Sequence, residues 1–392
     1  MNHWLDVLLL VLVLGYGLSG YWQGFLVGAS ATLGLLLGGA VGALALPRLL
    51  QGYEPSLGLS VIALGIVLLC ALVGQAIGSY LGGLWRRRVT WRPARSLDAL
   101  AGAALSMAAA LLVAWVLGYA VSGTRIPAVS TAVRSSVVLE QVDQVLPESA
   151  DQALGTLTSV VDNSLFPRYL EPFTRERIEA VPQPDSRIAN RAGVRDASGG
   201  VVKVLGEAPQ CGSNLQGSGF VYAPERVMTN AHVVAGVDAL SVTVDDDVYE
   251  ASVVLYDPDL DVAVLRVDGL PVTPLSFDEG ADSGDSAAVL GFPENGAYDV
   301  RPARLRSQQR LSSPDIYGDG QVSREVFAVR ALIRQGNSGG PLVSPQGRVY
   351  GVVFAASLAD DRTGYVLTAR QVARDAAAGQ GAEQPVPTGD CA

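Results

Sequence analysis

The sequence predicts four membrane-spanning helices followed by an all-β domain of packed antiparallel barrels. Four apolar stretches occupy the first 122 residues, and the chain is 49% hydrophobic but only 17% charged. After residue 201 the pattern changes to short alternating strands separated by Gly, Pro and Asp turns. We therefore divide the chain into a membrane domain at 1–122, a connector at 123–195 and a β domain at 196–392.

Each apolar stretch has about the length needed to cross the hydrocarbon core as a helix. A cleaved signal peptide would account for the first stretch alone. Two of the stretches carry a glycine at every fourth position, which predicts close helix packing in a compact bundle. The stretches are Trp4–Ser19, Phe25–Leu46, Leu57–Leu84 and Leu97–Val121, and the glycines are Gly34, Gly38, Gly42, Gly74, Gly78 and Gly82.

Five arginines crowd the connection between the third and fourth stretches: Arg86, Arg87, Arg88, Arg92 and Arg95. The other connections have at most one basic residue, so the positive-inside rule places this one in the cytoplasm. Counting outward, everything after residue 122 lies across the membrane. The sequence therefore predicts a multi-pass protein of the cytoplasmic membrane, in contact with the lipid bilayer, with its β domain in the periplasm or cell-wall space.

Charge is unevenly distributed along the chain. The net charge is -10, yet residues 1–122 contain six arginines and only three acids. The remainder therefore has a strong excess of acids, which argues against a nucleic acid as partner.

Asp6 and Asp98 lie near the starts of the first and fourth stretches. Carboxylates inside a membrane are usually functional, but these two are close to the interface, so we expect solvated helix-start positions. The four short Gly-rich spans with these acids resemble the CvpA-like membrane domain over about the first 120 residues.

The connector has valines and leucines at helical spacing, which predicts short amphipathic helices before a looser stretch near Pro182. Arginines recur through this stretch, at Arg175, Arg177, Arg187, Arg191 and Arg195. A protease could cut itself here; the alternative is an ordinary linker.

His232, in Thr229-Asn230-Ala231-His232, is the only histidine of the β domain. A general base that works near neutral pH is best supplied by an imidazole, which makes His232 the candidate. An isolated histidine is more often structural, but this one directly follows a predicted strand hairpin.

Three aspartates compete as the partner of such a base, in Asp257-Pro258-Asp259-Leu260-Asp261. A carboxylate that fixes an imidazole must be buried and held in place. Asp261 directly precedes an apolar strand and is the candidate, while Asp257 and Asp259 are expected to shape the turn.

Ser338 lies in Gly336-Asn337-Ser338-Gly339-Gly340-Pro341. Acyl transfer needs a hydroxyl on a tight turn and backbone N–H groups directed at the developing oxyanion. Glycines permit that backbone shape, and we expect the amides of Gly336 and Ser338 to form the oxyanion hole.

These three motifs, in the order His, Asp, Ser, resemble the trypsin-like serine proteases over residues 200–378, nearest to the HtrA-type branch. The resemblance implies a chymotrypsin-like fold of two six-stranded β-barrels with the triad between them. Four spans followed by such a domain, without a PDZ module, resemble the actinobacterial membrane serine proteases of the MarP type. No peptide-binding module is therefore expected to regulate the enzyme.

Cys211 and Cys391 flank the β domain, and outside the cytoplasm they could form a disulfide or remain two free thiols. In the MarP family a disulfide closes the protease domain, which matches this pair. Neither a cofactor nor a metal is expected.

By the same resemblance, the pocket for the residue before the scissile bond is lined by residues 331–333 and 353–356. These segments contain no acid, which predicts preference for a small or medium apolar side chain. The long polar region Tyr298–Arg324 is expected to be a mobile loop that could order the oxyanion hole.

The sequence thus predicts an extracytoplasmic, membrane-anchored serine endopeptidase. It would cleave protein or peptide substrates through an acyl-enzyme, with a role in envelope stress resistance. The alternative is a membrane scaffold or transporter partner whose protease fold is only a binding module.

Overall fold

The structure is a computed structural model that describes residues 4–49, 57–122, 132–146, 176–211, 213–357 and 360–392. It divides the chain into two compact units. One comprises Met1–Tyr119 with Ser136–Leu146, and the other comprises Ala120–Ser135 with Pro147–Ala392. The described parts of the expected connector are therefore shared between the two units.

The first unit contains four long helices: α1 (Trp4–Gln23), α2 (Phe25–Leu49), α3 (Leu57–Arg88) and α4 (Arg92–Ser122). All four are long and apolar enough to cross a membrane. Gly24, with φ +79°, separates α1 from α2. A short amphipathic helix, α6 (Val137–Val145), also belongs to this unit, as the valine spacing predicted.

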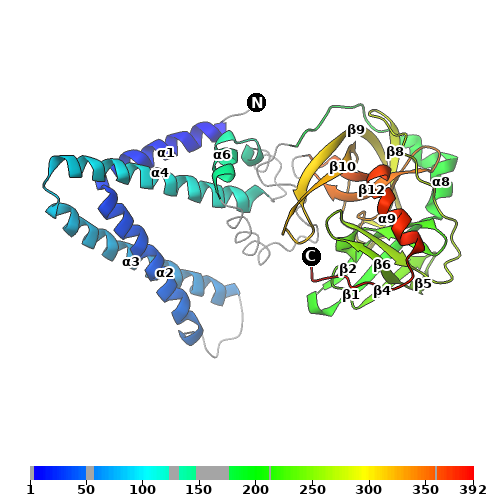
Figure 1. Ribbon diagram of the computed structural model, residues 1–392, viewed down its shortest axis with the longest axis horizontal. Helices are drawn as coiled ribbons and strands as arrows, with labels where there is room; N and C mark the ends of the chain where they lie inside the picture. Colours follow the sequence, from blue (N-terminus) through cyan, green and yellow to red (C-terminus); the bar gives the residue numbers. More distant parts are fainter. Residues whose placement is uncertain (1–3, 50–56, 123–131, 147–175, 212, 358–359) are drawn as a thin grey trace. The chain divides into compact units, whose positions relative to one another are not determined.

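Small residues allow these helices to approach closely, α2 to α3 and α1 to α4 (Figure 1). A Cβ atom on Gly34 of α2 would lie 2.1 Å from the carbonyl oxygen of Gly74 on α3. A Cβ atom on Gly20 of α1 would lie 2.4 Å from the carbonyl oxygen of Gly102 on α4. The glycine stripes of α2 and α3 thus face each other, which is why they form a pair.

The expectation of solvated aspartates in this unit is wrong, because both carboxylates are shielded and bonded. Asp6 accepts a hydrogen bond from the Ser136 hydroxyl at 2.6 Å, at the N-terminus of α6. Asp98 forms an ion pair with Arg86 at 2.9 Å and accepts the backbone N–H of Leu26 at the same distance. Each aspartate joins segments that are distant in sequence.

The second unit begins its β structure with a seven-stranded antiparallel sheet in the order β5-β4-β1-β2-β3-β7-β6. This is one strand more than the six expected for each barrel, because a break at Ala251 separates β5 from β6. Asp245 and Asp246 both have positive φ, so they make the tight turn that returns β5 along β4. The strands are β1 (Val201–Ala208), β2 (Ser213–Ala223), β3 (Arg226–Thr229), β4 (Ala239–Val244), β5 (Asp247–Glu250), β6 (Ser252–Asp257) and β7 (Val262–Arg266).

The other six strands form a closed barrel in the order β10-β13-β12-β11-β8-β9. The predicted mobile loop at 298–324 is wrong: it consists mostly of β9 and β10, a long antiparallel hairpin that is prominent in Figure 1. The strands could not be recognised from the sequence, because few of their side chains are apolar. The strands are β8 (Ser286–Gly291), β9 (Asp299–Pro314), β10 (Gln321–Arg330), β11 (Pro341–Val343), β12 (Val349–Ala356) and β13 (Thr363–Thr368).

Short helices flank the two sheets: η1 (Ser186–Asn190) and α8 (Ala192–Ser198) before β1, and α9 (Ala369–Gly381) after β13. One apolar cluster joins the sheets, with Phe220 and Met228 from the first and Leu290 and Phe354 from the barrel. The two sheets therefore share a core, and the loops between their strands are held on a common rigid base.

Candidate active site

His232 lies in η3 (Ala231–Val233), one turn of 3₁₀ helix that follows β3. Its ring Nδ1 is 2.9 Å from Oδ2 and 3.1 Å from Oδ1 of Asp261. Its backbone N–H also donates to Asp261 Oδ1 at 2.9 Å. A carboxylate at Nδ1 favours the tautomer with the proton there, which leaves Nε2 available as a base.

Asp261 is fully buried at the start of β7. Its φ is +64°, a left-handed conformation that side-chain-bearing residues seldom adopt. Its carbonyl oxygen accepts a hydrogen bond from Asn230 Nδ2 at 2.8 Å, two residues before His232. Asp257 has the turn-shaping position expected of it, because its Oδ1 accepts the Leu260 N–H at 2.8 Å.

Ser338 lies between β10 and β11, in a turn that both sheets hold. The Ser338 carbonyl oxygen accepts the Ser218 N–H from β2 at 2.8 Å, and the Gly339 N–H donates to Val353 on β12, also at 2.8 Å. Gly339 has φ +80°, and a Cβ atom there would lie 2.3 Å from Thr229 Oγ1. The serine turn is thus packed against the end of β3, where the His232 segment begins.

The backbone before Ser338 is fixed by two contacts from neighbouring loops. The Gln335 carbonyl oxygen accepts the Glu294 N–H at 2.7 Å, from the turn η4 (Pro293–Asn295). Because a trans peptide points its N–H opposite to its C=O, the Gly336 N–H is directed away from η4. The Gly336 carbonyl oxygen in turn accepts the Ser218 hydroxyl at 2.6 Å.

Sequence reasoning missed the part played by Ser218 and Glu294. The Ser218 hydroxyl donates to Gly336 and accepts the Phe292 N–H at 2.9 Å, so it connects the serine turn to the loop that contains η4. Its place between Gly217 and Gly219 was the only signal. Glu294 holds the Gln335 carbonyl oxygen through its backbone N–H, so the identity of its side chain could not predict this contact.

Both segments predicted to line the pocket for the residue before the scissile bond lie against β13, where Ala356 pairs in register with Gly364. Ala331 and Ile333 are buried, whereas Leu332 is 36% exposed. A Cβ atom on Gly364 of β13 would lie 2.2 Å from Ile333 Cγ1, so the isoleucine occupies the space that a side chain there would need. The surroundings of Ile333 are therefore tightly filled and apolar.

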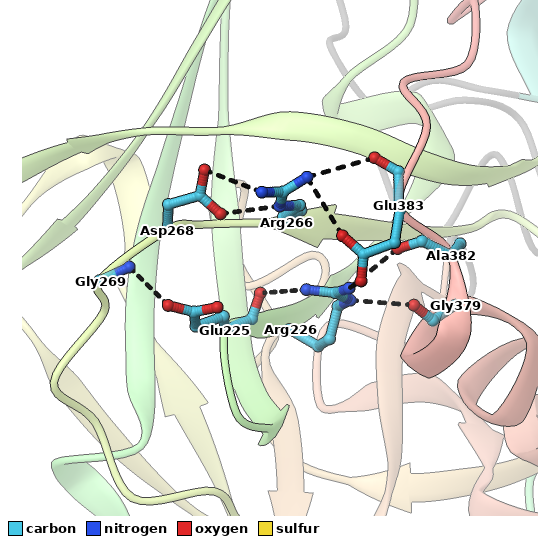
Figure 2. A network of polar contacts seen from close by, with 8 residues as sticks. All are labelled: Glu225, Arg226, Arg266, Asp268, Gly269, Gly379, Ala382 and Glu383. Atoms are coloured by element: carbon cyan, nitrogen blue, oxygen red, sulfur yellow. Dashed lines mark hydrogen bonds and ion pairs between the residues drawn. The ribbon is translucent and has the colours of Figure 1, made fainter.

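A C-terminal tail follows α9 along the first sheet. Arg226 and Arg266 fasten its start by hydrogen bonds to Gly379, Ala382 and Glu383, as Figure 2 shows. Farther on, Gly236 donates its N–H to Thr388 at 3.1 Å, four residues after His232. Cys211 and Cys391 then form a disulfide with a Cα–Cα distance of 5.6 Å.

Within the described ranges, no group of three or more His, Cys, Asp or Glu side chains is arranged to hold a metal ion. His232, Asp261 and Ser338 can supply the chemistry of an imidazole, a buried carboxylate and a hydroxyl.

Comparison with known proteins accounts for both units. A family model described as a trypsin-like peptidase domain matches residues 217–352, and one described as colicin V production protein matches residues 5–147. Serine protease Rv3671c of Mycobacterium tuberculosis is 39% identical over 393 residues, covering 100% of this chain and 99% of that protein. The chain belongs to the MarP family of membrane-linked serine proteases.

Structural comparison agrees with this assignment to the MarP family. The crystal structure of the Rv3671c protease from M. tuberculosis in its active form is 49% identical, with a TM-score of 0.54. It covers 57% of this chain, and 98% of that structure is covered. Mitochondrial serine protease HTRA2 of Bos taurus is 36% identical over 159 residues, 38% of this chain and 34% of that protein, which relates the MarP-type protease domain to the HtrA proteases.

Proposed function

We propose that this serine protease is an extracytoplasmic endopeptidase in which Ser338 is the nucleophile, His232 the general base and Asp261 the residue that orients it. The observation that supports this most directly is the contact between His232 Nδ1 and the fully buried Asp261 carboxylate at 2.9 Å. The packing of the Ser338 turn against the end of β3 supports the third member.

The reaction follows from these roles. Ser338 Oγ attacks the peptide carbonyl carbon while its proton passes to His232 Nε2, and the N–H groups of Gly336 and Ser338 stabilise the oxyanion. Collapse of the tetrahedral intermediate breaks the C–N bond, and His232 returns the proton to the leaving amine. Water then attacks the resulting acyl-enzyme by the same proton route, which releases the acid and regenerates Ser338.

The membrane topology is part of this proposal. The cluster of arginines around the end of α3 and the start of α4 favours a cytoplasmic location for that connection. The protease unit then lies on the extracytoplasmic side of the membrane, where a Cys211–Cys391 disulfide can persist. Substrates would be proteins or peptides of that compartment, with envelope stress resistance as the physiological role.

Self-processing is proposed for the part of the connector before the protease unit. Arg306 and Arg330 each donate a hydrogen bond of 2.6 Å, to the carbonyl oxygens of Glu179 and Val181 respectively. Backbone held in this way is a poor substrate, so cleavage is expected upstream of it. Residues 147–175, the part of the connector upstream of this backbone, lie outside the described residues, and Arg175 is among them.

The substrate residue before the scissile bond is proposed to be small or medium and apolar. Ile333 fills the space above Gly364, and the strand at 353–356 offers only apolar side chains. A cleavage profile over a peptide library tests this, and preference for Arg or Lys at that position would contradict it.

Ser338→Ala tests the function itself. The full-length protein in detergent is expected to lose peptide hydrolysis by about a millionfold, to the detection limit, because the nucleophile acts as a unit with its base. If cells with the inactive variant keep the wild-type phenotype, the protein acts as a scaffold or transporter partner instead.

A further inference from the structure

The turn that carries Asp261 is contacted by the closed six-stranded barrel as well as by its own seven-stranded sheet. This aspartate turn (residues 257–261) connects β6 to β7 in the seven-stranded sheet. The tip of the β9–β10 hairpin reaches it from the barrel, where the Ile316 N–H donates to the Pro258 carbonyl oxygen at 3.3 Å. The hairpin therefore contacts the turn that carries Asp261, a member of the proposed triad.

Arg324 on β10 makes the stronger link. Its side chain has no solvent exposure, and its Nη2 donates to the carbonyl oxygen of Asp259 in the aspartate turn. Its Nη1 donates to the Pro314 carbonyl oxygen at 2.9 Å and to the Ser313 hydroxyl, both at the end of β9. One guanidinium thus joins the aspartate turn to the hairpin, which suits a planar group with two separate donor nitrogens better than the single nitrogen of a lysine ammonium.

Asp261 needs this support because its own conformation is unfavourable. Its φ of +64° is strained for a residue with a side chain and persists only where surrounding contacts determine it. Asn230 and His232 hold its carbonyl and carboxylate from the first sheet. The barrel hairpin holds the backbone of Pro258 and Asp259 through Ile316 and Arg324. The strained backbone of Asp261 is therefore fixed by contacts from both sheets.

We propose that Arg324 is a positioning residue that holds the aspartate turn so that the Asp261 carboxylate faces His232. The proposal rests on the proposed triad and adds a coupling between the barrel hairpin and the first sheet. Burying an arginine is costly unless its donors find acceptors, and here Nη1 and Nη2 both have them, among them the Asp259 carbonyl oxygen.

The test compares Arg324→Met and Arg324→Lys with a matched control, Arg310→Met, in full-length protein in detergent. Arg310 is an exposed arginine on the same hairpin, paired in register with Glu325. We expect Arg324→Met to lower kcat about tenfold to a hundredfold with KM little changed, because substrate contacts stay intact. Arg324→Lys retains the charge and most of the volume, and its kcat should lie between those of wild type and Arg324→Met.

The pH dependence of kcat/KM separates positioning from a general loss of stability. If the Asp261 carboxylate is displaced, the imidazolium form of the base loses stabilisation, so the acid limb should move to lower pH. A purely structural role would lower the melting temperature and leave the acid limb of the folded enzyme in place.

The outcomes can be told apart. Folded Arg324→Met with kcat within about twofold of the Arg310→Met control and an unmoved acid limb would overturn the positioning role. If Arg324→Met does not fold, kcat and the acid limb of kcat/KM are measured for Arg324→Lys instead. Values equal to those of the Arg310→Met control would again overturn the positioning role. Hydrolysis that survives in Ser338→Ala would refute the proposed function, whereas loss of hydrolysis there with normal Arg324 variants refutes the positioning role alone.

Discussion

Asp375 on α9 is a buried carboxylate outside the predicted triad, and it makes stability depend on pH. Only 7% of the residue is exposed, and within the described residues its Oδ2 has no hydrogen-bond partner. Burial raises the pKa of Asp375 to about 6, the negative charge of Asp257 adds to the rise, and Arg374 opposes it. The change Asp375→Asn keeps the shape and removes the titrating group.

The direction of the effect follows from proton binding. Between the ordinary pKa of 3.8 and the raised value of about 6, the folded state binds more protons at Asp375 than the unfolded state. The carboxyl therefore lowers stability as pH rises through this window, and the full cost is present above it. A shift of this size corresponds to about 3 kcal/mol, which we reduce to about 1–2 kcal/mol because Asp375 keeps some contact with solvent, which screens its charge.

Hydrogen–deuterium exchange of the β7 and α9 amides in full-length protein measures this effect locally. At about pH 7, Asp375→Asn should slow exchange by roughly tenfold relative to wild type, and at about pH 4 the two should agree. The exposed change Asp246→Asn alters the net charge equally and should show no such difference. Equal protection of wild type and Asp375→Asn at both pH values would refute the reasoning.

Two further changes test the scaffold around the site. Cys211→Ser opens a cross-link that spans 180 residues, worth about 5 kcal/mol in the chain-entropy account, so it should shorten the lifetime of activity more than it lowers the initial rate. Time courses of hydrolysis measure this, and two free thiols in the exported wild type would remove its basis. Gly339→Ala should abolish hydrolysis, because the new Cβ would lie 2.1 Å from the Ser218 carbonyl oxygen. Its control, Gly318→Ala, has a similar φ of +77° but open space, and should cost only about 1 kcal/mol of stability by urea titration.

The sequence points to the candidate site residues whose chemistry is local, and their catalytic roles stay predictions. His232, Asp261 and Ser338 each stand beside a strand in a motif whose residue types suit one role. The buried position of Asp261 followed from the apolar strand after it, and the structure agrees in placing it against His232. Periodicity likewise found most strands, because alternating apolar residues mark a half-buried sheet.

The missing parts depend on contacts between distant segments. The β9 sequence alternates arginine, serine and glutamine, so it has the composition of a loop although it lines a closed barrel. The function of Arg324 depends on the Asp259 carbonyl oxygen, 65 residues away, which no local pattern encodes. The membrane aspartates were misjudged for the same reason, since their partners lie on other helices or, for Asp6, 130 residues away.

Mapping of a fluorophosphonate adduct tests the central claim most directly. The probe forms a covalent bond only with a serine whose hydroxyl is activated by a neighbouring base. Peptide mass spectrometry of labelled full-length protein should place the adduct on Ser338, and both Ser338→Ala and His232→Ala should abolish labelling. An adduct on any other serine, or labelling that persists in Ser338→Ala, would contradict the account.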